Sequence, residues 1–254
     1  DSGYFSYVKH NKEGEAIGIL RSEDGRNMNI GMDGASPIIA GICTDEQRKI
    51  ITEKLLDKTR LWTKLGISVD QKAPHANVNA YINETVWISH QWFFWKTFLD
   101  LGLGQEAWEQ ANTALRVFSR ETERTYHCWE HYTQKSLLGS GWHQFSGLNA
   151  PLVNWYHIYF KPGNIYGGFD FWVRSQKMTD DYSEVQIEFE LQDLHRSKFK
   201  NVLVSLNEKY NYQVYLNGKE IDHKRITETT LQISVPAIEK NNTLKILKKF
   251  NSYN

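Results

Sequence analysis

The stretch Phe160-Lys161-Pro162-Gly163 divides the sequence into two parts that differ in periodicity. Before it, apolar residues recur every three to four positions, which is typical of amphipathic helices. After it, apolar and polar residues alternate, which is typical of half-buried strands. The sequence therefore predicts an α + β chain of more than one domain. We place the first domain at residues 1–162 and a small antiparallel β-sandwich at residues 163–254.

The strand-rich part contains short runs at regular spacing. The residues at 186–192 alternate in polarity and those at 202–206 form a buried run. The run at 212–216 leads into Asn217-Gly218, a dipeptide that favours a tight hairpin turn. Runs at 230–235 and 243–247 complete the set. Such spacing with turns between the strands predicts a β-sandwich.

The first part contains four predicted helices. Thr44 and Gln47 form a capping-box pattern at the start of the first helix. The second, at about 84–101, is apolar on nearly all sides, so we expect it to be buried. Helices at about 105–120 and 148–160 follow. Three connecting segments are predicted to be loops, the first of them with short strands; they lie at 1–37, 58–80 and 125–147.

The composition excludes several classes of protein. Among 254 residues, 30 Lys and Arg balance 30 Asp and Glu, so no basic field favours nucleic acid or an anionic membrane surface. No apolar run reaches the ~18 residues of a membrane span. Cys43 and Cys128 are too few for a disulfide framework and lack metal-ligand spacing. We expect a soluble chain without cofactor, metal, nucleic-acid or membrane partner.

The segment Tyr126-His127-Cys128-Trp129-Glu130-His131-Tyr132 places a carboxylate among aromatic side chains. Burial raises the pKa of a carboxyl group toward the range that suits acid or base catalysis. Glu130 is therefore a candidate catalytic residue. A structural role stays open, in which Glu130 pairs with His131, Arg124 or a backbone amide and holds the loop. A metal site at His127, His131 and His143 lacks compact ligand spacing.

Further motifs lie on both sides of this segment in a fixed order. They are Asp1-Ser2-Gly3-Tyr4-Phe5, Ser36-Pro37-Ile38-Ile39-Ala40-Gly41-Ile42, the aromatic run 81–95, the Gly-rich step 139–141 and Phe145-Ser146-Gly147-Leu148. Over residues 1–172 these motifs resemble glycoside hydrolases of family 63 and the related mannosylglycerate hydrolase type. The resemblance implies the C-terminal portion of an (α/α)6 toroid, and an inverting α-glycosidase acting on an oligosaccharide or glycoside.

The resemblance also implies a role for Glu130, which stands where the family has the general base that activates water. Inverting hydrolysis needs a second carboxyl group, the general acid, about 6.5–9.5 Å away. In the family this acid is an Asp well upstream, so we expect it in a missing N-terminal part of the same polypeptide. Asp33 and Glu84 are fallback candidates for the acid.

Sugar contacts are expected from aromatic and polar side chains, because Trp and Tyr stack on sugar rings as readily as they pack in cores. Residues 81–87 read Tyr-Ile-Asn-Glu-Thr-Val-Trp where the family commonly has Tyr-Trp-x-Gly-Pro-x-Trp, so part of that subsite differs. The candidate substrate-binding residues are Tyr81, Trp87, His90, Gln91, Trp92, Trp129, His131, Trp142, His143 and Gln144. Core packing is the alternative for the residues on the helix, and packing within the loop is the alternative for those at 142–144.

Two other functions stay open. The chain could be a non-catalytic carbohydrate-binding or structural module that keeps the sugar pocket, which the missing acid favours. It could also catalyse elimination on uronic acids, which would require a basic residue at the site.

Overall fold

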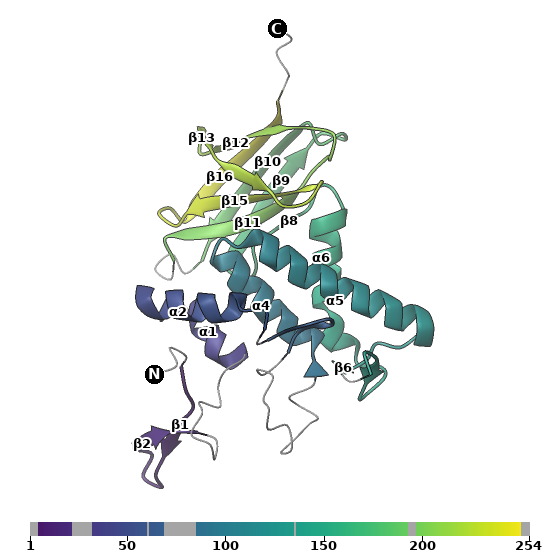
Figure 1. Ribbon diagram of the computed structural model, residues 1–254. Helices are drawn as coiled ribbons and strands as arrows, with labels where there is room; N and C mark the ends of the chain where they lie inside the picture. Colours follow the sequence, from purple (N-terminus) through teal and green to yellow (C-terminus); the bar gives the residue numbers. More distant parts are fainter. Residues whose placement is uncertain are drawn as a thin grey trace. The chain divides into compact units, whose positions relative to one another are not determined.

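The structure is a computed structural model that describes residues 5–21, 32–59, 61–68, 85–134, 136–192 and 197–249, without the side chains of 32–35. The chain forms two compact units (Figure 1). We call Asp1–Thr97 with Gln110–Pro151 the first unit, and Phe98–Glu109 with Leu152–Asn254 the sandwich unit. Helices α4 (Ile88–Asp100) and α5 (Gly104–Thr125) contribute residues to both.

The first unit combines helices with three small antiparallel sheets. Its remaining helical elements are α1 (Met32–Ala40), α2 (Asp45–Leu56) and the 3-10 helix η1 (Ser146–Asn149). The sheets pair β1 (Val8–His10) with β2 (Ala16–Ile19), β3 (Trp62–Thr63) with β4 (Gly66–Ile67), and β5 (Thr85–Val86) with β6 (His131–Thr133) and β7 (Gly139–Ser140).

The capping box at Thr44 is confirmed. The Thr44 hydroxyl accepts a hydrogen bond from the Gln47 N–H over 3.2 Å, and the Gln47 side chain accepts one from the Thr44 N–H over 2.9 Å. Two donors that the helix start leaves unpaired are thereby satisfied. Ile51 and Leu55 lie buried on the same helix, as the apolar stripe predicts.

The prediction of a buried helix near 84–101 is also confirmed, because Phe94, Trp95, Phe98 and Leu99 of α4 are buried. The helix begins at Ile88, four residues later than predicted. Just before it, Thr85–Val86 is extended and pairs with β6, which excludes it from the helix.

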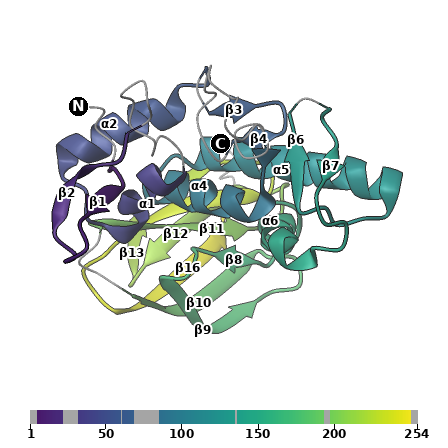
Figure 2. The same ribbon diagram turned by 90° about the horizontal axis from the view of Figure 1, so that it is seen from below.

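The sandwich unit contains two antiparallel sheets. One has the order β13-β12-β16-β10-β9 and the other the order β14-β15-β11-β8 (Figures 1 and 2). The strands are β8 (Ile165–Tyr166), β9 (Phe171–Met178), β10 (Glu184–Leu191), β11 (Phe199–Ser205), β12 (Tyr212–Leu216), β13 (Lys219–Ile221), β14 (His223–Arg225), β15 (Thr230–Pro236) and β16 (Asn241–Lys248).

One hydrophobic core joins the two sheets. Val185, Ile187 and Phe189 of β10 and Val202 and Val204 of β11 belong to the same buried cluster. Two packed faces with alternating inward residues are the arrangement of a β-sandwich. The predicted hairpin at Asn217-Gly218 is confirmed, since both residues have positive φ, 50° and 83°, and β12 pairs with β13 across them.

Strand β9 has a bulge where it pairs with β10, between Glu188 and Phe189. Helix α6 (Pro151–Phe160) also belongs mostly to this unit. The hydroxyls of Thr229 and Thr230 donate hydrogen bonds to the carbonyls of Tyr159 and Ile158, each over 2.9 Å, which satisfies acceptors at the end of α6.

The predicted partial (α/α)6 toroid is wrong. In the part of the chain that the structure describes, the protein is rich in strands, and three small sheets lie within residues 8–140. The apolar periodicity predicts α2, α4, α5 and α6, but it misses α1, whose residues 32–37 lie in a segment predicted to be a loop with short strands. The toroid rested on the resemblance of the motifs and their order. The segments between the helices form short strands such as β5, β6 and β7, whose backbone groups are paired with each other.

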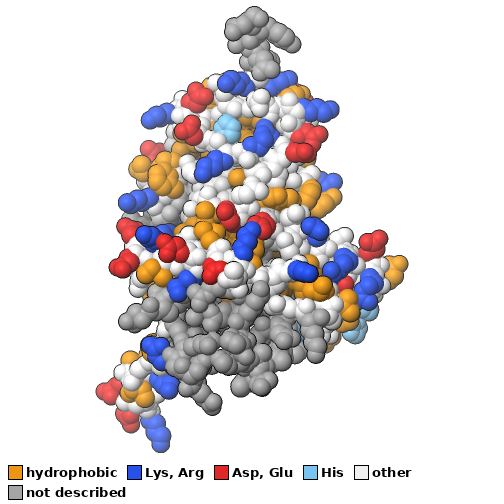
Figure 3. Space-filling model, in the orientation of Figure 1, with side chains coloured by type: hydrophobic (Ala, Val, Ile, Leu, Met, Phe, Trp, Pro, Cys, Tyr) orange, Lys and Arg blue, Asp and Glu red, His pale blue; other side chains and the backbone are white. Residues whose placement is uncertain are grey.

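On the face drawn in Figure 3, Lys and Arg side chains are interspersed with Asp and Glu, without a broad field of one sign. None of the described helices is both long and apolar enough to cross a membrane.

Candidate functional site

The segment 127–145 folds back on itself around Glu130. Strand β6 pairs with β7 through His131 opposite Ser140 and Tyr132 opposite Gly139, and the two strands lie side by side in Figure 2. Nearer the ends, the Cys128 N–H donates to the His143 carbonyl over 3.1 Å. The Glu130 N–H donates to the Trp142 carbonyl over 2.9 Å. These main-chain bonds fix the backbone on both sides of Glu130.

The half-buried carboxylate of Glu130 is fixed by the same backbone. Its Oε2 accepts a hydrogen bond from the Trp142 N–H over 3.0 Å. Gly141 permits this approach, because a Cβ at this position would lie 2.5 Å from Oε2 and 2.7 Å from His131 Cε1. Gly141 also has φ +78°, which side chains disfavour.

Aromatic rings of the same segment pack against one another. The Trp142 side chain is 66% exposed and packs edge-on against Phe145, with ring centroids 5.9 Å apart. His127 lies edge-on to both Trp129 and His143, at 5.3 and 4.8 Å. His143 and the neighbouring Gln144 are exposed. The structure therefore brings Trp129, Trp142, His143 and Gln144 of the predicted set into one segment with Glu130.

His131, the residue after Glu130, and His90 both stack on the indole of Trp87. The Trp87 ring lies 5.2 Å from His131 and 5.6 Å from His90, nearly parallel to both. Burial lowers the pKa of His131, and the Glu130 carboxylate partly opposes this. The neutral imidazole is therefore favoured beside Glu130. His131 is fully buried in the structure.

Gln91 and Trp92, the other predicted contacts on α4, have protein partners. The Gln91 side chain accepts from the Ile67 N–H over 2.8 Å, donates to the Ile67 carbonyl over 2.6 Å and accepts from Gln110 over 2.8 Å. Gln91 thus holds β4 against α4. The Trp92 ring packs against Phe93 and Trp95 of its own helix.

For three predicted residues the structure describes no side chain. Tyr81 and Glu84 are not among the described residues, and Asp33 is on α1 without a described side chain. Within the described residues, no group of three or more His, Cys, Asp or Glu side chains is arranged to hold a metal ion.

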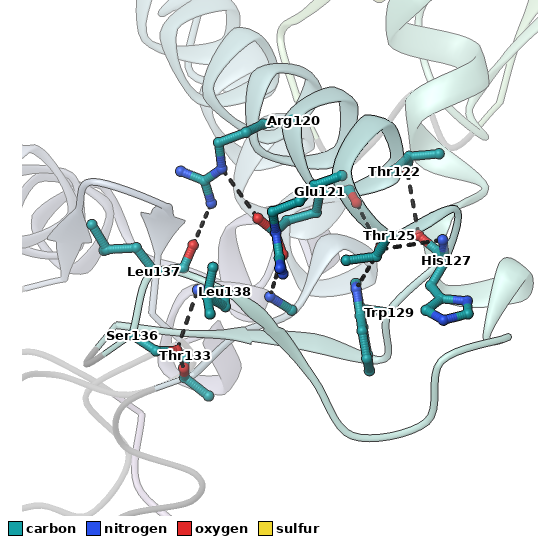
Figure 4. Close-up of polar contacts among 12 residues, drawn as sticks. Arg120, Glu121, Thr122, Thr125, His127, Trp129, Thr133, Ser136, Leu137 and Leu138 are labelled. Atoms are coloured by element: carbon teal, nitrogen blue, oxygen red, sulfur yellow. Dashed lines mark hydrogen bonds and ion pairs between the residues drawn. The ribbon is translucent and has the colours of Figure 1, made fainter.

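One residue next to the site, Glu121 on α5, is not among the residues that the sequence predicts. Its side chain is fully buried and forms ion pairs with Arg120 and Arg124 (Figure 4). Burial raises the pKa of Glu121, but hydrogen bonds from Arg124 and the Gly139 N–H and the two guanidinium charges outweigh it and lower the pKa overall. In the sequence these three residues resemble a solvated face of an amphipathic helix, so only the spacing of Glu121 and Arg124 was a signal.

Comparisons with known proteins identify no family. No family model matches the chain, and no curated protein matches it. Among solved structures, neutral trehalase Nth1 from Saccharomyces cerevisiae is similar, with 17% sequence identity and a TM-score of 0.42. The similarity covers 61% of this chain and 26% of the trehalase chain, so this chain spans about a quarter of that protein. A similarity this distant carries no conclusion about activity, and the resemblance to family 63 stays a prediction.

Proposed function

We propose that this chain is part of a glycoside hydrolase and carries the general base, Glu130, of an inverting reaction on a neutral oligosaccharide or glycoside. The main support is one arrangement: the Glu130 carboxylate is held by the N–H of Trp142, whose indole is exposed. The residue that fixes the carboxylate thus also carries an exposed indole, which can stack on a sugar ring, while the carboxylate can accept a proton.

The two carboxylate oxygens of Glu130 have different surroundings. Oε2 is occupied by the Trp142 N–H, while no hydrogen bond from a described residue reaches Oε1. Oε1 would accept the proton of the water that attacks the anomeric carbon. The leaving oxygen needs a proton from a general acid about 6.5–9.5 Å away. We place this acid outside the described residues, and the similarity of the motifs to family 63 favours an α-glycoside.

The test is hydrolysis of a panel of aryl α-glycosides by the purified protein, together with the part that carries the general acid, and by its Glu130→Gln variant. Loss of the base should lower the rate by about 10²–10⁴-fold. Glu123→Gln, an exposed carboxylate on α5, is the matched control and should leave the rate unchanged. NMR of the first product anomer should show inverted configuration. A rate for Glu130→Gln within about tenfold of wild type would show that Glu130 is not the base.

A second candidate function is non-catalytic carbohydrate binding. The hydrogen bond between Glu130 and the Trp142 N–H favours it, since a carboxylate that only holds a loop makes the same contact. Calorimetry with neutral oligosaccharides separates the two functions: binding with no turnover by any glycoside of the panel would support the binding module. Preference for uronic acids with release of an unsaturated product would instead support elimination.

A further inference from the structure

The buried carboxylate of Glu121 links the last turns of α5 to β7. Oε1 lies 3.2 Å from Arg120 Nε, and Oε2 accepts hydrogen bonds from Arg124 and from the Gly139 N–H, each over 2.9 Å (Figure 4). A buried carboxylate is costly unless it is paired, and here both of its oxygens have donors. Because Gly139 belongs to β7 and Glu121 to α5, this hydrogen bond fixes the position of β7 relative to α5.

The same turns of α5 also form hydrogen bonds with the chain on both sides of Glu130. Arg120 donates a hydrogen bond to the Leu137 carbonyl, just before β7. In the part of the segment before Glu130, the Thr125 hydroxyl accepts hydrogen bonds from Trp129 Nε1 over 3.2 Å and from the His127 N–H over 3.3 Å. Side chains of α5 therefore hold the chain both before and after Glu130.

The parts of the chain before and after Glu130 come into contact where Trp129 lies against Gly139. A Cβ at Gly139 would lie 2.0 Å from Trp129 Cδ1, so only glycine allows this contact. From Gly139 the chain needs three residues to reach Trp142, whose N–H binds Glu130. A shift of Gly139 would be passed directly to that N–H, because the intervening backbone is short.

We infer that Glu121 is a positioning residue for Glu130, acting through the Gly139 N–H and the backbone of 139–142. That this positioning supports catalysis rests on the proposed function. That Glu121 orders the backbone of 139–142 does not depend on it. Glu121 does not touch substrate in this role. With a fully buried side chain and cationic partners on both oxygens, Glu121 is also unsuited to donate a proton to a leaving group.

The first test is amide hydrogen exchange in the purified protein, followed by mass spectrometry of peptides that cover 137–145. Glu121→Ala removes the acceptor of the Gly139 N–H, and we expect exchange in these peptides to rise about tenfold or more. Exchange in the sandwich unit should stay as in wild type. Glu121→Gln retains an acceptor oxygen and should give a smaller rise, while Glu123→Gln, the control, should give none.

Arg124→Gln provides a second variant if Glu121→Ala does not fold, because Arg124 is half-exposed and its loss leaves the Gly139 contact in place. It should raise exchange in these peptides above the wild-type level, but by less than Glu121→Gln. Unchanged exchange at 137–145 in the Glu121 variants would overturn the inference. A uniform rise across the whole chain would also overturn it, because that result indicates general destabilisation.

Kinetics then separate positioning from the proposed function. We expect Glu121→Gln to lower kcat about tenfold with KM within about twofold, since a displaced base impairs the chemical step more than binding. Glu121→Asp, which keeps the charge, should restore part of kcat. If the exchange result holds but the wild-type protein hydrolyses no glycoside even together with the part that carries the general acid, the proposed function fails and the positioning of the Glu130 segment remains.

Discussion

The N–H of Trp142 donates to Oε2 of Glu130 over 3.0 Å, so the residue with the exposed indole also orients the carboxylate. The orienting group belongs to the backbone and the stacking group to the side chain. Substitutions at Trp142 and at Gly141 therefore separate substrate binding from the orientation of the base.

Trp142→Ala removes the stacking surface but retains the N–H that binds Glu130. We expect weaker sugar binding by about 1 kcal/mol, or about fivefold, with little change in thermal stability because the indole is 66% exposed. Calorimetric titration and thermal unfolding check this. Trp172→Ala removes a half-exposed indole of the sandwich unit and is the control, with unchanged affinity. Equal losses in both variants would refute a specific role for Trp142.

Gly141→Ala should displace the loop from Glu130. The added Cβ would lie 2.5 Å from Oε2, and φ of +78° costs a side chain about 1–2 kcal/mol. We expect the unfolding free energy to fall by at least this amount and most of the activity to be lost. Gly147→Ala is the matched control, since a Cβ there meets nothing within 4 Å. Denaturant unfolding and the glycoside assay measure both effects, and wild-type activity in Gly141→Ala would contradict the close approach.

Glu121 should contribute to the acid sensitivity of the protein. Because the folded state lowers the pKa of this carboxyl, its stabilisation is present above the ordinary Glu pKa of about 4.3 and is lost as pH falls through the lower folded value. Urea unfolding between about pH 6 and pH 3 should show a smaller loss of stability for Glu121→Gln than for wild type. Parallel curves for the two proteins would rule out this contribution.

The sandwich unit contains a buried ion pair between Lys200 and Asp170, in which each charge depends on the other for its compensation. Lys200 Nζ lies 2.6 Å from Asp170 Oδ2, and both side chains are nearly fully buried. Asp170→Asn should lower the unfolding free energy by about 3–5 kcal/mol, because it leaves a buried charge without its partner. Lys200→Met combined with Asp170→Leu should recover much of this loss. If urea unfolding shows that the double variant loses as much stability as its two single variants together, the two side chains are not coupled.

Local signals predicted the parts of the fold that depend on neighbours in sequence. The Thr44–Gln47 capping box and the Asn217-Gly218 turn are complete within a few residues, so their chemistry can be identified without the tertiary structure. The alternating residues of β10 likewise identified a strand with one buried face.

The features that the sequence did not reveal depend on distant partners. Strands as short as β5 and β7 have no detectable period, and each exists because it pairs with β6. Glu121 links α5 to β7 through Gly139, eighteen positions along the chain, whose N–H donates to its carboxylate. Of the site, Glu130 and its aromatic neighbours were recognisable by residue type, whereas the need for glycine at 141 follows from a contact across the hairpin.

The edges of the two sandwich sheets have a further consequence, which concerns aggregation. A long, flat edge strand invites pairing with another chain, and bulges, short strands and charged side chains prevent it. Edge strand β9 has a bulge in its pairing with β10 and carries Arg174 and Lys177. The edge strands β8, β13 and β14 have only two or three residues each. These features disfavour fibril-like association through the sheet edges.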